Sequence, residues 1–169
     1  MLGKDEVLTW LRQRGIPFAY EQHDAVLNMA ESGLLTLTLD GARCKNLLLQ
    51  DKKGQYFLVV TTSNKALDLS GAAEAIGSKR LSFASGDTLF ELLGIRTGSL
   101  SPLALVNDAA RRVRLILDAD LEGEPVFLFH PLENTASVAL ARAAFEAFLA
   151  GLERPVEWLA LPARVAAGE

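Results

Sequence analysis

The feature that most constrains the fold of this chain is a pair of apolar runs on either side of a short charged turn. Residues 46–50 read NLLLQ, residues 56–61 read YFLVVT, and the turn between them contains DKKG. Apolar runs that meet at a charged, glycine-bearing loop are typical of a β-hairpin, because glycine adopts turn conformations that other residues avoid. The sequence therefore predicts a hairpin that the rest of the chain has to bury.

The elements around this hairpin mix helices with short strands. Residues 4–14 and 140–152 each place apolar side chains on one stripe at helical spacing. We further expect helices at residues 28–36, 70–76 and 87–93, and strands at 18–23, 81–84, 103–108 (LALVND), 113–118 (VRLILD), 126–131 (VFLFHP) and 156–161 (VEWLAL). Several strands are close enough in sequence to pair as hairpins. This indicates an α/β chain of the α+β type, a single domain over residues 1–169, with a mixed, mostly antiparallel β-sheet and helices packed around it.

Composition and charge exclude several classes of protein. Half of the residues are hydrophobic, yet no apolar run approaches the roughly 20 residues of a membrane helix. The first residues mix acids with bases and do not indicate a signal peptide. The net charge of −4 argues against a DNA-binding regulator, since such proteins are usually basic, but not against an enzyme that touches the end of an RNA. We therefore expect a cytoplasmic protein with neither DNA nor a membrane as a partner.

The inventory of reactive residues is small. The chain has two histidines, one cysteine, and no HExxH, P-loop, GxGxxG or GxSxG motif. His23 and His130 have no metal-ligand spacing to nearby carboxylates, so we expect no metal and no cofactor. Cys44 could act as a nucleophile with His130 as its base. Its position before an apolar run instead favours a small, buried, unreactive side chain.

Three polar positions interrupt this apolar background. Lys45 and Asn46 precede the strand LLLQ, either as a solvated strand end or as a clamp for a phosphate or a polarised carbonyl. The loop GSLSP (98–102) is either a plain connector or a backbone wall that grips a small ligand. His130 follows VFLF and precedes the polar residues Asn134, Thr135 and Ser137, which favours a site over a purely structural histidine.

In chain order, KNLLL (45–49), YFLVV (56–60), GxxxP (98–102) and FHPLxN (129–134) form a series that resembles the YbaK-type, aminoacyl-tRNA-synthetase-associated editing domains. The resemblance covers residues 5–160. Within that family, the stretches LGIRTGSLSPLALVND and FHPLENTASVAL are similar to the freestanding alanyl-tRNA(Pro) deacylases, which correct a prolyl-tRNA synthetase that lacks its own editing insert. Leu103 departs from the pattern, because many relatives have an aromatic residue after the proline.

The resemblance implies hydrolysis of the ester between an amino acid and the terminal adenosine of tRNA, without a metal or a protein nucleophile. By that analogy Lys45 and Asn46 would hold the terminal phosphate or polarise the ester carbonyl, and His130 would orient the ribose or a water. The implied substrate-binding residues are Gly98, Ser99, Leu100, Ser101, Pro102 and Asn134. The implied partners are the acceptor end of mischarged tRNA(Pro) and prolyl-tRNA synthetase.

Other functions remain open at this stage. The same fold could deacylate Cys-tRNA(Pro) or another small aminoacyl-tRNA, or it could bind tRNA or a synthetase without cutting. Contacts with the tRNA body are also open. The cations that could make such contacts, or that simply form a solvated face, are Lys52, Lys53, Lys79, Arg80, Arg111, Arg112 and Arg114.

Overall fold

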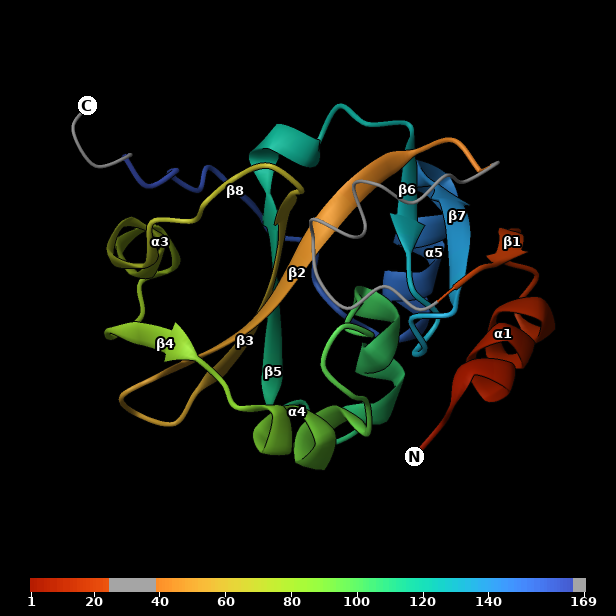
Figure 1. Ribbon diagram of the computed structural model, residues 1–169, viewed down its shortest axis with the longest axis horizontal. Coiled ribbons are helices and arrows are strands. Elements are labelled where there is room, and N and C mark those ends of the chain that lie inside the picture. Colours follow the sequence, from red (N-terminus) through yellow and green to blue (C-terminus); the bar gives the residue numbers. More distant parts are fainter. Residues whose placement is uncertain (25–38, 166–169) are drawn as a thin grey trace.

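The computed structural model describes residues 1–24 and 39–165, which form a mixed sheet with helices against both faces (Figure 1). The helices are α1 (Lys4–Gln13), α3 (Leu69–Ile76), α4 (Gly86–Leu93) and α5 (Arg142–Gly151), with the 3-10 helices η1 (Pro102–Asn107) and η2 (Ala119–Leu121). The strands are β1 (Ala19–Gln22), β2 (Ala42–Asp51), β3 (Tyr56–Thr62), β4 (Leu81–Phe83), β5 (Val113–Asp118), β6 (Val126–Phe129), β7 (Ala136–Ala141) and β8 (Trp158–Leu159). No helix in the described part of the chain is long and apolar enough to cross a membrane.

The strands follow the order β1-β7-β6-β2-β3-β5-β8, and β4 adds to β2. Pairs β1–β7, β6–β7, β2–β3 and β2–β4 are antiparallel, whereas β2–β6, β3–β5 and β5–β8 are parallel. The long strand β2 joins the two parts of the sheet, because its first residues pair with β6 and the rest of it pairs with β3. The expected mixed, mostly antiparallel α+β architecture is confirmed.

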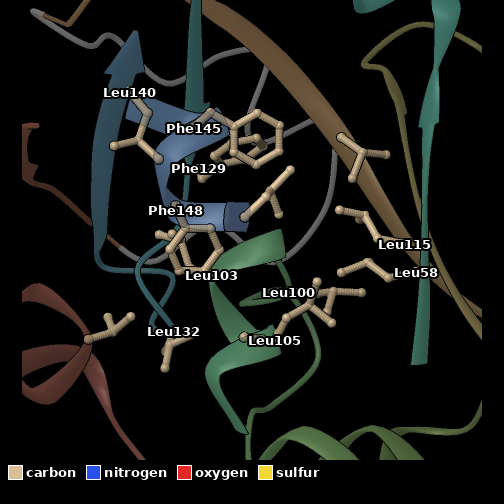
Figure 2. Packing of buried hydrophobic residues seen from close by; sticks show 14 of the residues in the cluster. Leu58, Leu100, Leu103, Leu105, Leu115, Phe129, Leu132, Leu140, Phe145 and Phe148 are labelled. Atoms are coloured by element: carbon tan, nitrogen blue, oxygen red, sulfur yellow. The ribbon is translucent and has the colours of Figure 1, made fainter. Parts of the chain in front are cut away.

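Two apolar clusters hold the sheet together from opposite sides. The main core gathers side chains from α1, α4, α5 and η1 on one face, and Figure 2 shows its aromatic centre. There the ring of Phe145 from α5 lies 5.4 Å from that of Phe127 and 5.2 Å from that of Phe129. A second core lies under α3 on the other face and contains Phe57 and Val59 of β3. Strand β3 is therefore buried on both faces, which explains why its sequence is continuously apolar rather than alternating.

Most of the expected elements are confirmed. The hairpin is formed by β2 and β3, paired from Cys44↔Thr62 to Gln50↔Tyr56. Helices α3 and α4 end at Ile76 and Leu93, as expected, and each is followed by a glycine, Gly77 or Gly94, in the left-handed conformation. The helix expected at residues 28–36 lies outside the described residues. Strand β7 was not expected, because its residues ASVALA are mostly small and apolar and show no clear alternation of polar and apolar side chains.

The strand expected at residues 103–108 is wrong: LALVN belongs to the 3-10 helix η1. Ser101 caps this helix by accepting a hydrogen bond from the N–H of Leu103, and Pro102 supplies the first-turn φ angle. A short, fully buried apolar run is compatible with either a strand or a helix, and here the Ser-Pro start decides for the helix.

Candidate active site

The loop of residues 98–102 is fixed from both of its ends. Gly98 has φ +92°, a conformation that other residues rarely adopt, and the N–H of Ser99 donates to the carbonyl of Arg96 at 3.1 Å. At the other end, the hydroxyl of Ser101 donates to the backbone carbonyl of His130 at 2.7 Å. Ser99, Leu100, Ser101 and Pro102 are all buried. The loop is therefore buried and hydrogen-bonded to the segment that follows β6.

His130 lies one residue beyond β6 and is largely buried. Its Nδ1 is 2.8 Å from the carbonyl of Ala136, and because a carbonyl only accepts, Nδ1 carries the proton. In the neutral ring, Nε2 is then the acceptor nitrogen. Burial is the main cause that lowers the pKa of His130, and the neighbouring His23 lowers it further, while the bond to Ala136 opposes both. The imidazole is therefore held neutral at physiological pH.

His23 is the functional candidate that sequence reasoning missed as a partner of His130. Its backbone N–H donates to the carbonyl of Thr135 at 2.8 Å, which extends the β1–β7 pairing by one residue. The two imidazole centroids are 6.0 Å apart, and His23 Nε2 is 2.8 Å from the hydroxyl of Ser137. The only sequence signal was that His23 ends an alternating stretch. The partnership depends on β7, which was not expected.

Lys45 and His130 both lie just beyond the parallel pairing of β2 with β6. In the parallel β2–β6 pair, Ala42 faces Phe127 and Arg43 faces Leu128. The pairing ends there, and Lys45 and His130 each lie two residues further along their own segment. The ammonium of Lys45 donates to the carbonyl of Lys65, and no hydrogen bond among the described residues joins it to the imidazole. Burial is the main cause that lowers the pKa of Lys45, and the charge of Arg164 lowers it further.

Asn46 points to the opposite face of β2 from Lys45, because side chains alternate along a strand. Its neighbours in that alternation, Cys44 and Leu48, belong to the main core. The side-chain oxygen of Asn46 is buried and accepts no hydrogen bond from the described residues. An unsatisfied buried acceptor costs roughly 1–3 kcal/mol, so this oxygen is a strong candidate for contact with a ligand donor.

Three other residues were singled out from the sequence. Asn134 is half-buried in the β6–β7 connection, the same segment as His130. Leu103, the departure from the family pattern, is fully buried in the main core (Figure 2). Cys44 is only partly exposed, and burial raises the pKa of its thiol to about 12. A thiol this weakly acidic is protonated at neutral pH and is a poor nucleophile.

Comparison with known proteins gives the class to which this fold and these residues belong. The model of the aminoacyl-tRNA editing domain family matches residues 31–148, and the chain belongs to this family. It is therefore an enzyme, an aminoacyl-tRNA deacylase.

The relatives narrow the class further. The chain is 34% identical to the prolyl-tRNA editing protein ProX of Acetoanaerobium sticklandii, over 83% of this chain and 87% of that protein. It is also 34% identical to prolyl-tRNA synthetase associated domain-containing protein 1 of Xenopus laevis, over 86% of this chain and 89% of that protein. The fold matches the crystal structure of hypothetical protein APE2540 with a TM-score of 0.71 at 20% identity, covering 91% of this chain and 98% of that one.

Proposed function

We propose that this protein hydrolyses the ester of alanine wrongly attached to tRNA(Pro), acting in trans on products of prolyl-tRNA synthetase. The names of the relatives support prolyl-tRNA as the substrate class. The preference for a small amino acid is inferred from the hydrogen bond between Ser101 and His130. This bond fixes the buried loop of residues 98–102 beside the candidate histidine. Packed walls yield poorly, so such a wall excludes larger side chains by steric clash.

The proposed reaction is ordinary ester hydrolysis. A water adds to the carbonyl carbon, the oxyanion collapses, and the bond to the ribose oxygen breaks. That oxygen takes up a proton, which gives free alanine and deacylated tRNA. Orientation of the water and stabilisation of the oxyanion supply the rate, because an ester is already activated and needs no protein nucleophile.

The proposed roles follow from the position of each group. Nε2 of His130, which is unprotonated in the neutral ring, accepts a hydrogen bond from the ribose hydroxyl or the water. The unsatisfied oxygen of Asn46 accepts from a ribose hydroxyl or from the α-ammonium of alanine. The backbone of residues 98–102 lines the side-chain pocket. Lys45 holds the terminal phosphate rather than the ester carbonyl, because its ammonium points away from Asn46.

A deacylation assay on a panel of mischarged tRNAs tests this function. We expect turnover of Ala-tRNA(Pro) that exceeds turnover of Cys-tRNA(Pro) and Ser-tRNA(Pro). Faster turnover of Cys-tRNA(Pro) would move the assignment to a different small amino acid within the same reaction class. No turnover of any aminoacyl-tRNA by folded protein would refute the assignment and favour a binding module.

A further inference from the structure

The C-terminal segment of the described chain lies beside the loop that holds Lys45. Residues 162–164 form three backbone contacts with residues 66–68: the N–H of Asp68 donates to the carbonyl of Pro162 at 3.0 Å, Leu67 bridges Ala163, and the N–H of Arg164 donates to the carbonyl of Ala66 at 2.6 Å. The preceding residue, Lys65, offers the carbonyl that accepts from Lys45. Arg164 is thus held by its backbone next to the anchor of Lys45.

The neighbouring carboxylates are already occupied by a different lysine. The ammonium of Lys65 bridges Asp118 at 2.7 Å and Asp120 at 2.8 Å. The carboxylate of Asp118 is fully buried and also accepts a 2.5 Å hydrogen bond from Thr61. This network fixes the side chain of Lys65, whose ammonium neutralises one of the two carboxylate charges.

Lys45 and Arg164 do not take part in the Lys65 network. Among residues 1–24 and 39–165, no carboxylate lies within ion-pair distance of either side chain. Within the described part of the chain, the Lys45 ammonium donates to a neutral carbonyl. The positive charge of Arg164 repels that of Lys45 and so contributes to the lowered pKa of the Lys45 ammonium. An anion placed between them would relieve this repulsion.

We propose that Lys45 and Arg164 together bind one phosphate, the one on the 5′ side of the terminal adenosine of the tRNA. An arginine fork and a lysine point charge are complementary donors for a phosphate. The phosphate named is the one nearest to the ester, and Lys45 and His130 each lie two residues beyond the last β2–β6 pair. The inference rests on the proposed function for the identity of the RNA. Arg164 lies beyond residues 31–148, so the family match does not include it.

Two small substrates separate the phosphate contact from the chemistry. One is adenosine esterified with alanine on its ribose, and the other is the same ester of adenosine 5′-monophosphate. We expect wild-type protein to hydrolyse the phosphorylated ester with the higher kcat/KM. Arg164→Ala should lower kcat/KM for that ester by roughly tenfold and leave the unphosphorylated ester unchanged. Both cations are proposed to hold the same phosphate. Arg164→Ala should therefore lower kcat/KM for the phosphorylated ester by a smaller factor in the Lys45→Ala background than in the wild type.

Lys53→Ala is the matched control, because it removes one exposed charge at the far end of the same hairpin. It should leave both esters unaffected. A readout independent of catalysis is the binding of adenosine 5′-monophosphate followed by NMR titration, which Arg164→Ala and Lys45→Ala should each weaken.

The outcomes also distinguish this inference from the proposed function. If no alanyl ester is hydrolysed but Arg164→Ala still weakens binding of adenosine 5′-monophosphate, the function fails and the phosphate site stands. If both esters are hydrolysed equally, and Arg164→Ala changes neither hydrolysis nor binding, the function stands and the phosphate site is refuted.

Discussion

The hydroxyl of Ser101 links two segments that are 29 residues apart, because it donates to the carbonyl of His130 at 2.7 Å. The same oxygen accepts from the N–H of Leu103 at 3.2 Å and so begins helix η1. The fully buried side chain of Ser101 therefore connects the loop of residues 98–102, the start of helix η1 and the backbone of His130. The distance between this loop and the segment that carries His130 depends on the Ser101 hydroxyl.

Ser101→Ala should accordingly impair both folding and activity. It leaves a buried carbonyl and a buried N–H without their partner, which costs roughly 1–3 kcal/mol of unfolding free energy. Urea denaturation measures this loss, and deacylation of Ala-tRNA(Pro) should fall in the variant that remains folded. Ser78→Ala is the control, since its exposed hydroxyl bonds only to the adjacent carbonyl of Lys79. Unchanged stability and activity in Ser101→Ala would show that the link is dispensable.

Lys45→Ala should lower deacylation by on the order of tenfold to a thousandfold, the range for removing one stabilising donor. The free energy of unfolding should fall by only about 1 kcal/mol, because the Lys45 side chain makes one hydrogen bond and no ion pair with the described residues. Single-turnover kinetics and thermal denaturation check both parts. A folded variant with full activity would return Lys45 to the role of an ordinary strand-end lysine.

The pH dependence of stability should carry a contribution from His130. Its pKa in the folded protein lies below the ordinary value of 6.5, so between these two values the unfolded chain binds more protons than the folded one. The free energy of unfolding should therefore decrease as the pH falls from 6.5 and level off below the folded pKa. Urea titrations at several pH values, with His130→Gln as reference, isolate this contribution. An equal pH dependence in both proteins would contradict it.

Cys44→Ala should retain most of the deacylase activity. Its thiol, with a pKa of about 12, is not ionised under assay conditions, and the proposed reaction uses no thiolate. Steady-state kinetics of the purified variant, supported by a test for a trapped acyl-enzyme in the wild type, provide the check. A folded but inactive Cys44→Ser protein with an acyl-cysteine intermediate in the wild type would overturn the mechanism.

The fold could be predicted from the sequence wherever local chemistry and burial agree. The β2–β3 hairpin was predictable because its charged turn and apolar runs indicate the same structure, and Gly77 and Gly94 end their helices for a local reason. Helix η1 was mistaken for a strand because its run LALV is continuously apolar, so the sequence has no hydrophobic period that separates a strand from a helix.

The candidate site was less predictable, because its geometry depends on pairings between distant segments. His130 could be selected as the polar end of an apolar strand. Its neighbour His23 could not, since they meet only through the β1–β7 pairing. The approach of Arg164 to Lys45 depends in the same way on backbone contacts between residues 66–68 and 162–164. Local sequence carries no trace of such contacts.

The proposed selectivity depends on a size sieve, which is needed because a proline pocket cannot exclude alanine. A pocket discriminates weakly against a smaller side chain, since one methylene is worth only about 1–3 kcal/mol, so a second site that admits only small residues is needed. The rigid loop from Gly98 to Pro102 is the proposed wall of that site.

Correctly charged Ala-tRNA(Ala) carries the same amino acid and must be spared by a different means, namely recognition of the tRNA near its acceptor end. The decisive measurement is therefore the deacylation rate of Ala-tRNA(Pro), Pro-tRNA(Pro) and Ala-tRNA(Ala), assayed side by side with the same enzyme preparation. We predict rapid hydrolysis of Ala-tRNA(Pro) alone. Rapid hydrolysis of Pro-tRNA(Pro) would contradict the size sieve.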